Sequence, residues 1–275
     1  VAVFPESGPH IIKSVGKIDN LSEKLKTQQV ESTVGIAHTR WATHGGVTEQ
    51  NAHPHTDCRG KIILVHNGII ENYRELKDKL GKNHAYKSET DSEVLAHLIE
   101  TKYQGDLRKA VLESLSEVRG TYGLVVMHAD HPERIVVARM GSPLVVGIGE
   151  DEYFVASDAT PMLAYTKKVI FLEDGEVAEI SRTELQTVNL KDHFVQKEVQ
   201  EIEWDEAQAQ TQGFPHFMLK EIFEQAGVIG DTLNTFINPA TGKITVPENI
   251  LNALDAAPRL TMVACGTAYY ACMVG

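Results

Sequence analysis

Three kinds of feature are scarce or absent in this sequence, and each absence excludes a class of protein. The chain holds only three cysteines in 275 residues, an odd and sparse set that argues against a disulfide framework and for a reducing compartment. No apolar run approaches the length that spans a bilayer, and no signal-peptide pattern opens the chain. Basic residues are scattered within a formal net charge of −12, so no basic face is present to neutralise nucleic-acid phosphates. These absences predict a soluble, cytoplasmic protein with neither a nucleic-acid nor a membrane partner.

The rest of the composition is that of a globular protein, and the pattern along the chain changes near residue 205. Residues 1–205 are mostly strand-like with three helical segments, which indicates an α+β sandwich of two sheets covered by helices. A polar segment at 204–217 that contains Gly213 and Pro215 is typical of a linker. Residues 206–275 then carry two helical patterns and an apolar strand that runs into small residues, which is typical of the start of an α/β unit.

Local patterns place the individual elements. Strands are expected where Val, Ile and Tyr cluster between turn residues, at 33–42, 61–70, 121–129, 134–141, 143–149 and 152–157. Residues 168–180 are expected to form a hairpin with Asp174-Gly175 at its tip. Helices are expected at 72–82, 90–103, 106–118, 216–234 and 248–257, and an apolar strand is expected after Arg259. The helix at 90–103 opens with Thr90-x-x-Glu93, the pattern of a capping box.

Reactive polar side chains are concentrated between residues 38 and 91, where five of the twelve histidines fall at 38–66. One hypothesis is a metal site around His53-Pro54-His55, completed by His44 or His66. The two rings of an H-x-H pattern point to opposite faces of a regular strand, and no H-E-x-x-H or Cys-x-x-Cys motif supports such a site. We therefore predict neither a metal nor another cofactor.

A second hypothesis is a site that hydrolyses the side-chain amide of an amino acid. Arg40 can hold an α-carboxylate through two charge-assisted hydrogen bonds, and Asp91, at a helix start, can hold an α-amine. Attack on the amide produces an oxyanion, and the Asn67 side-chain N–H beside the Gly68 backbone N–H is a suitable donor pair. The same dipeptide is also the strongest local signal for a type I′ hairpin turn, so both interpretations stay open. No nucleophile is evident, because Cys58 lies in a polar turn without an assigned base.

The motifs GIAHTRWATHG, NAHPH, VHNGIIENY and SETDSEV, in that order, resemble those of class II (N-terminal nucleophile) glutamine amidotransferases. RGTYGLVVM, GSPLVVGIG, FVASD, IFLEDGEVAEI, FMLKEIFEQ and ACGTAYYA extend the likeness over the whole chain, to members in which a sugar-isomerase domain follows. The resemblance implies a four-layer αββα sandwich over 1–205, without its N-terminal segment, and a truncated α/β sugar-isomerase (SIS) domain over 206–275. It also implies ammonia transfer from glutamine to fructose 6-phosphate, yielding glucosamine 6-phosphate and glutamate, with no cofactor and with a homodimer as the full-length enzyme.

The resemblance further implies roles for individual residues. Asn67 and Gly68 would form the oxyanion hole, and Trp41 would border the ammonia path. The residues expected to bind glutamine are Arg40, Thr43, His44, His53 and Asp91. The residues expected to begin the sugar-phosphate loop are Cys265, Gly266 and Thr267, followed by Ala268, where a serine is common in the family.

In this family the nucleophile is the cysteine of the mature N-terminus, which is expected upstream of Val1, and most sugar-site residues are expected beyond Gly275. The chain is therefore expected to be an internal piece that is poorly stable and inactive by itself. Cys58 is not expected to substitute, because a turn thiol of ordinary pKa is mostly protonated at neutral pH. The alternative is a non-catalytic glutamine-binding or scaffold relative that lacks the nucleophile.

Overall fold

A six-stranded antiparallel sheet is the centre of the first of two units into which the chain divides, Val1–Glu206 and Ala207–Gly275. The structure, a computed structural model, describes residues 1–275 except 6, 29, 203–212, 238–246, 265 and 275. The strands of the central sheet, in spatial order, are β12 (Leu185–Asn189), β11 (Glu176–Ile180), β7 (His131–Met140), β6 (Gly120–His128), β5 (Ile62–Ile70) and β4 (His55–Thr56).

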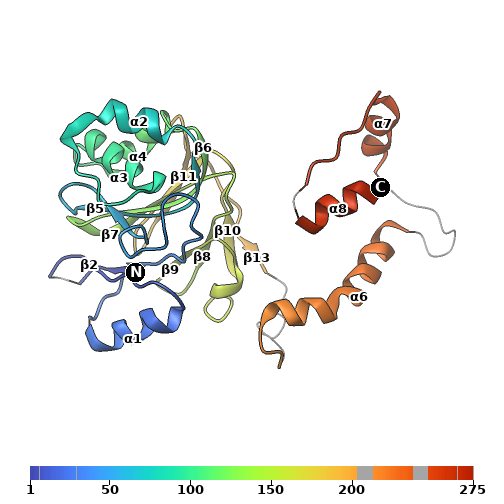
Figure 1. Cartoon of the computed structure of the whole chain (residues 1–275), viewed down its shortest axis with the longest axis horizontal. Helices are drawn as coiled ribbons and strands as arrows, with labels where there is room; N and C mark the ends of the chain where they lie inside the picture. Colours follow the sequence, from blue (N-terminus) through green and yellow to red (C-terminus); the bar gives the residue numbers. More distant parts are fainter. Residues whose placement is uncertain (6, 29, 203–212, 238–246, 265, 275) are drawn as a thin grey trace. The chain divides into compact units, whose positions relative to one another are not determined.

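Helices cover one face of this sheet, as Figure 1 shows: α2 (Tyr73–Leu80), α3 (Asp91–Lys102) and α4 (Leu107–Leu115). Alternate residues of β5, among them Ile62 and Leu64, pack against these helices in one hydrophobic core. Within α3, every residue from Asp91 to Ile99 is buried. The first turn of α3 is therefore held inside the protein, which fixes the side chains that it carries.

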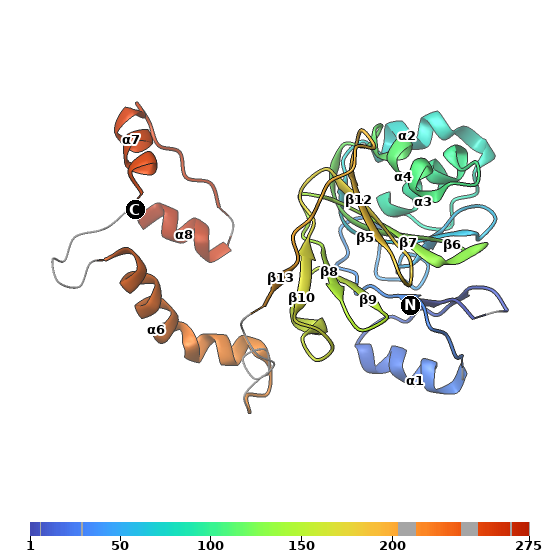
Figure 2. The same cartoon turned by 180° about the vertical axis from the view of Figure 1, so that it is seen from behind.

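The opposite face of the central sheet packs on two smaller sheets. One consists of β2 (His10–Ile11), β1 (Ala2–Val3) and β3 (Gly35–Ile36), and the other of β13 (Gln200–Glu201), β10 (Lys168–Phe171), β8 (Val145–Ile148) and β9 (Tyr153–Ala156). The intervening residues of β5, Ile63 and Val65, join this second core. Helix α1 (Ile18–Gln28) lies beyond the small sheets, on the side away from α2–α4 (Figures 1 and 2). These layers confirm the predicted α+β sandwich.

The three predicted helices of this unit are present, and their ends follow the expected signals. Gly81, at φ 70°, ends α2, and the Thr90 hydroxyl accepts a hydrogen bond from the Glu93 backbone N–H at the start of α3. The second half of the capping box is absent, because the Glu93 carboxylate accepts from the backbone N–H groups of Lys87 and Ser88. Helix α1 was not predicted, although Ile18, Leu21 and Leu25 have helical spacing; none of its residues is buried.

Two strand predictions for this unit are wrong. The segment 168–180 does not form a hairpin, since β10 pairs with β8 and β13 whereas β11 pairs with β7 and β12. The chain crosses from one layer to the other at Asp174-Gly175, because a local turn signal does not specify which sheet the next strand joins. Of the predicted strand 33–42, only Gly35–Ile36 pairs with another strand.

The second unit contains the two predicted helices, α6 (Phe217–Phe236) and α7 (Glu248–Ala256), and a third, α8 (Gly266–Val274). The apolar strand predicted after Arg259 is wrong, since residues 259–264 are irregular and Leu260 and Val263 are exposed. An apolar run becomes a strand only when a partner strand takes up its backbone hydrogen bonds. Most of the predicted linker lies at 203–212, outside the described residues. Among the described helices, none combines the length and apolar character that crossing a membrane requires.

Candidate functional site

The Asn67-Gly68 pair lies within β5, where Asn67 is opposite Gly123 and Gly68 is opposite Tyr122 of β6. The hairpin-turn interpretation is therefore wrong. Gly68 has φ 141°, and a Cβ added to it would lie 2.1 Å from the carbonyl oxygen of Thr121, so glycine is required for steric reasons. The Asn67 side chain is exposed. Its amide N–H groups are thus accessible to a ligand beside a backbone that cannot carry a side chain.

Asp91 lies at the first turn of α3, 3% exposed, where a carboxylate complements the helix dipole. Its Oδ2 accepts a hydrogen bond of 2.7 Å from the backbone N–H of Ile70, at the end of β5. Its Oδ1 lies 3.7 Å from Nδ1 of His44, and the Ser92 hydroxyl is 3.4 Å away. One carboxylate oxygen is thus fixed to the strand that carries Asn67, while the other faces the half-buried His44.

The loop that follows β3 brings Arg40 and His44 to the same region. The Arg40 guanidinium donates to the backbone carbonyls of its own loop: to Gly46 at 3.0 Å, to Gly45 at 3.4 Å, and to His44. Both terminal nitrogens of the guanidinium are thereby used to shape the loop. Arg40 is joined to Asp91 through His44, whose carbonyl accepts from the guanidinium and whose ring faces the carboxylate.

Asn51 and Gly45, neither of which was predicted as a site residue, help to hold this loop against the start of α3. The buried Asn51 side chain donates to the Gly46 carbonyl at 3.1 Å and to the Glu89 carboxylate at 3.0 Å, and it accepts from the Glu89 backbone N–H at 2.9 Å. Gly45, at φ 74°, leaves no room for a side chain, since a Cβ would lie 2.6 Å from the Asn51 amide nitrogen. Asn51 is the first residue of the NAHPH motif, and its place in that motif was the sequence signal that could have identified it.

A serine–histidine pair lies directly behind Asp91. His66 Nε2 donates to the Thr121 carbonyl at 3.2 Å, so its Nδ1, 2.8 Å from the Ser92 hydroxyl, is the acceptor. Burial lowers the pKa of His66, although the Thr121 carbonyl and Asp91 act in the opposite direction. His66 and Ser92 are both buried, at 2% and 3% exposed. The pair is a buried contact beside Asp91, in which the Ser92 hydroxyl donates to His66 and lies 3.4 Å from Asp91 Oδ1.

His38, His53 and His55 form a cluster in which His53 and His55 are buried and His38 is half-buried. The His53 ring lies 4.3 Å from that of His38 and 4.6 Å from that of His55, and His55 Nε2 contacts the Thr90 hydroxyl at 3.1 Å. Burial lowers the pKa of His38 to about 4 and that of His55 to about 3, and it lowers the pKa of His53 as well. All three imidazoles are therefore neutral at neutral pH.

The ring nitrogens of this cluster do not converge as the ligands of one ion do. Across the described parts of the chain, one group of three or more His, Cys, Asp or Glu ligand atoms converges, and it contains Cys58 and none of the histidines of the 38–66 region. Cys58 lies with His84, His97 and Glu100, and burial raises the pKa of its thiol. Cys58 is thus neither an activated thiol nor a part of the region around Asp91.

The other predicted site residues are less informative. Trp41 is 88% exposed, and Thr43, also exposed, contacts His44 Nδ1 through its hydroxyl at 3.3 Å. Cys265 lies outside the described residues; Gly266 and Thr267 begin α8, but their side chains are outside the described part.

This arrangement has the chemistry of an amino-acid site. It combines a fixed carboxylate, a guanidinium in the neighbouring loop, and an exposed amide on the strand whose end anchors that carboxylate. A zwitterionic head group requires one anion and one cation, and an oxyanion requires nearby N–H donors.

Comparison with known proteins agrees with this chemistry. A family model described as a glutamine amidotransferase domain matches residues 10–214. Proteins named glutamine–fructose-6-phosphate aminotransferase [isomerizing] from Thermus thermophilus and Bacteroides thetaiotaomicron are each 46% identical, over 100% and 97% of this chain and 45% and 44% of their own lengths. The chain therefore spans less than half the length of these curated relatives.

Solved structures show the same likeness. Glutamine phosphoribosylpyrophosphate amidotransferase from B. subtilis, complexed with ADP and GMP, superposes with a TM-score of 0.59 and 25% identity, over 70% of this chain and 43% of that chain. A structure of the allosteric regulatory enzyme of purine biosynthesis gives 0.55 and 28%, over 64% and 39%. Because the family model covers most of the chain and the fold agrees, the chain belongs to the class II glutamine amidotransferase domain family.

Proposed function

We propose that the unit Val1–Glu206 binds L-glutamine and takes part in hydrolysing its side-chain amide. The observation that carries this proposal is the fixed position of Asp91, one oxygen of which is bonded to Ile70 at the end of the strand that presents Asn67. If the α-ammonium group of glutamine binds the other Asp91 oxygen, the side chain of the substrate would extend toward the exposed Asn67 amide. The 46% identity to the aminotransferases over the whole chain supports the same assignment.

In this proposal Asp91 binds the α-amine and Arg40 binds the α-carboxylate, with Thr43 and His44 beside them. Since Nη2 of Arg40 already donates to the carbonyls of His44 and Gly45, a carboxylate has to displace at least one of them to be held at two points. We therefore expect the 44–46 loop to move when glutamine binds. His53 is proposed to support the site without touching glutamine, because its side chain is buried in the histidine cluster.

Asn67 and Gly68 are proposed to form the oxyanion hole, in which the side-chain amide and a backbone N–H stabilise the tetrahedral intermediate. Such donors act mainly in the transition state, because the charge on the oxygen develops there. As the family resemblance implies, the nucleophile is expected to be the N-terminal cysteine of the full-length protein; Cys58 is not proposed in its place, because it lies in another cluster.

For the full-length protein we propose transfer of the released ammonia to fructose 6-phosphate, giving glucosamine 6-phosphate and glutamate in the cytoplasm. The names of the relatives support this proposal. Trp41 would border the ammonia path between the two sites. The first unit would then be a four-layer αββα domain, and residues 206–275 a linker and the start of a sugar-isomerase domain with Cys265, Gly266 and Thr267 in its phosphate loop. A homodimer is expected.

The experiment is a kinetic comparison in the full-length protein. Asn67→Ala is expected to lower kcat for glutamine hydrolysis by roughly 10²–10³ and to leave KM nearly unchanged, because Arg40 and Asp91 still hold the head group. Arg40→Ala is expected to raise KM by roughly 10–100-fold, the effect of losing charged hydrogen bonds. Asn252→Ala, an exposed asparagine of α7, is the matched control and should match the unmodified protein.

Three outcomes of this experiment differ in meaning. Full turnover by a folded Asn67→Ala protein would remove Asn67 from the oxyanion hole. Unchanged KM in Arg40→Ala would contradict the head-group assignment. Glutamine binding without any turnover in the unmodified full-length protein would favour the non-catalytic glutamine-binding alternative.

A further inference from the structure

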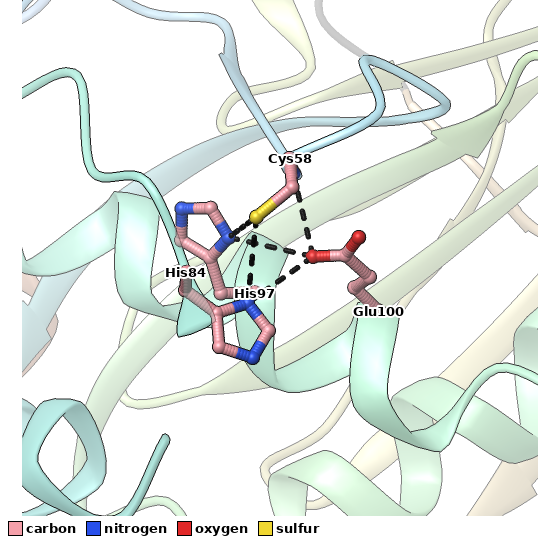
Figure 3. A group of neighbouring side chains, drawn as sticks. All are labelled: Cys58, His84, His97 and Glu100. Carbon is pink, nitrogen blue, oxygen red and sulfur yellow. Dashed lines mark hydrogen bonds and ion pairs between the residues drawn. The ribbon is translucent and has the colours of Figure 1, made fainter. Parts of the chain in front are cut away.

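A second polar cluster lies where three segments meet at α3. Cys58 follows β4, His84 follows the short helix η1 (Gly81–Asn83), and His97 and Glu100 lie one turn apart on α3. Figure 3 shows the Cys58 sulfur, the Nδ1 atoms of both imidazoles and one Glu100 oxygen turned toward one another. All four of these atoms lie within 4.8 Å of one another.

From this convergence we propose that Cys58, His84, His97 and Glu100 form a binding site for one divalent cation of the zinc class. The proposal does not depend on the glutamine site.

The distances between the four atoms match those between the ligands of one ion. Tetrahedral zinc, with Zn–S of about 2.3 Å and Zn–N or Zn–O of about 2.0–2.1 Å, places sulfur and nitrogen ligands about 3.6 Å apart and nitrogen and oxygen ligands about 3.3–3.4 Å apart. Cys58 Sγ lies 3.6 Å from His84 Nδ1 and 3.5 Å from His97 Nδ1. Glu100 Oε2 lies 3.3 Å and 3.5 Å from the same two nitrogens. Four of the six edges of the tetrahedron are therefore present.

The surroundings of His97 favour an ion at its Nδ1. The residue is 0% exposed, its Nε2 has no hydrogen-bond partner among the described residues, and the Glu93 carboxylate lies 3.7 Å from that nitrogen. A carboxylate therefore faces each ring nitrogen, while a neutral imidazole has only one N–H. If the His97 proton is on Nε2, toward Glu93, the lone pair on Nδ1 faces the Glu100 oxygen. A cation bound at Nδ1 would lie between that lone pair and the oxygen. A carboxylate behind a metal-bound histidine is the usual second partner of such a ligand.

Charge and access are also consistent with the proposal. One thiolate and one carboxylate balance a divalent ion, and two neutral imidazoles complete a four-coordinate set with no net charge. Sulfur and nitrogen donors select zinc over magnesium or calcium, which prefer oxygen. Cys58 is exposed at the outer edge and His97 is buried below it, so an ion has a way in. With four protein ligands the site would be structural, linking two loops to α3.

The test is a titration of the chelator-treated 275-residue chain with Co²⁺ alone, followed by Zn²⁺. We expect one Co²⁺ per chain, an absorption band from thiolate-to-cobalt charge transfer, the strong visible bands of a tetrahedral ion, and displacement by Zn²⁺. Cys58→Ser should abolish the charge-transfer band, and His84→Gln should weaken binding. Glu93→Gln should keep the band and weaken binding by roughly 10–100-fold, as expected for a partner behind a ligand.

Cys272→Ser and His131→Gln, which change a cysteine and a histidine elsewhere, are the controls and should bind as the unmodified chain does. Zn²⁺ should also raise the melting temperature of the unmodified chain and leave that of Cys58→Ser unchanged, which separates metal binding from a folding defect. The proposal is overturned if Co²⁺ binding produces no thiolate-to-cobalt band, if Cys58→Ser binds Co²⁺ equally well, or if the chain binds Co²⁺ only weakly and without a defined stoichiometry.

Discussion

Gly68 shows how a single residue joins fold and site. Its φ of 141° and the 2.1 Å approach of the Thr121 oxygen make it a position where any side chain disturbs the pairing of β5 and β6. Gly68→Ala is expected to lower the free energy of unfolding by about 3 kcal/mol or more, from backbone strain and overpacking together. Chemical denaturation measures this change directly.

Gly60→Ala is the matched control for that prediction. Gly60 also has a positive φ, of 69°, but a Cβ there meets nothing within 4 Å. Its substitution should cost only the strain of the left-handed conformation, about 1–2 kcal/mol. Equal losses in the two variants would show that the contact with Thr121 carries no energy.

The buried histidines predict how stability depends on pH. Their pKa values are lowered in the folded protein, to about 4 for His38 and about 3 for His55, whereas the unfolded chain takes up these protons near pH 6.5. Stability is therefore fully present above pH 6.5 and is lost as the pH falls toward 4. Urea unfolding at pH 7 and pH 5 should differ by at least about 2 kcal/mol, with a smaller difference in His55→Gln. An unfolding free energy that is constant over this range would argue against a neutral cluster.

Among the elements, α3 carries the largest share of the polar side chains described above. The position of its first residue, Asp91, depends on the cap that Thr90 provides. The buried Thr90 hydroxyl accepts from the Glu93 backbone N–H at 3.3 Å and contacts His55 Nε2 at 3.1 Å and the Ser88 hydroxyl at 2.9 Å. Thr90→Ala removes the cap, about 1 kcal/mol, and leaves buried polar partners unpaired, about 1–3 kcal/mol more. Thermal and urea unfolding should show a loss of about 2–4 kcal/mol, and Thr90→Ser should recover most of it.

Asp106 is a cap of the simpler kind and provides the comparison. It starts α4, and its side chain accepts only the Lys109 backbone N–H among the bonds described, at 2.9 Å. Asp106→Ala should therefore cost about 1 kcal/mol. If Thr90→Ala costs no more than Asp106→Ala, the buried contacts of Thr90 add nothing to its capping role.

The elements also show how far the sequence alone predicts this protein. The strong apolar patterns of α2, α3, α4, β5 and β6 were enough, because their apolar residues pack into the two hydrophobic cores. The hairpin at 168–180 failed because Asp174-Gly175 signals a turn and does not specify the partner of the strand after it. The strand after Arg259 failed because hydrophobicity without a partner strand does not make a sheet.

The candidate site shows the same limit. Arg40, Asn67 and Asp91 were found from residue type and from a family resemblance, but the Asn67-Gly68 pair fitted a turn equally well until β6 was seen beside it. The bond from Ile70 to Asp91 and the support from Asn51 depend on tertiary contacts. The convergence of Cys58 with His97, 39 positions later, has no local pattern that would predict it.

At the scale of the whole molecule, the chain consists of two units and spans less than half the length of its curated relatives. The family assignment rests on the first unit, which the family model matches almost throughout. The activity proposed for the complete protein is expected to need parts of those relatives that this chain does not cover, whereas the residues proposed to bind the glutamine head group all lie within it. Binding is therefore the property to measure on this chain.

That measurement is calorimetric titration of the folded chain with L-glutamine, beside Asp91→Asn and the control Asp106→Asn, which removes the same charge from the start of α4. We predict binding of one L-glutamine per chain, a loss of at least about tenfold in affinity for Asp91→Asn, and unchanged affinity for Asp106→Asn. D-Glutamine should bind more weakly, since its head group cannot meet Arg40 and Asp91 together with its amide at Asn67. Absence of glutamine binding by the folded chain, or equal binding by Asp91→Asn, would contradict the assignment of this site.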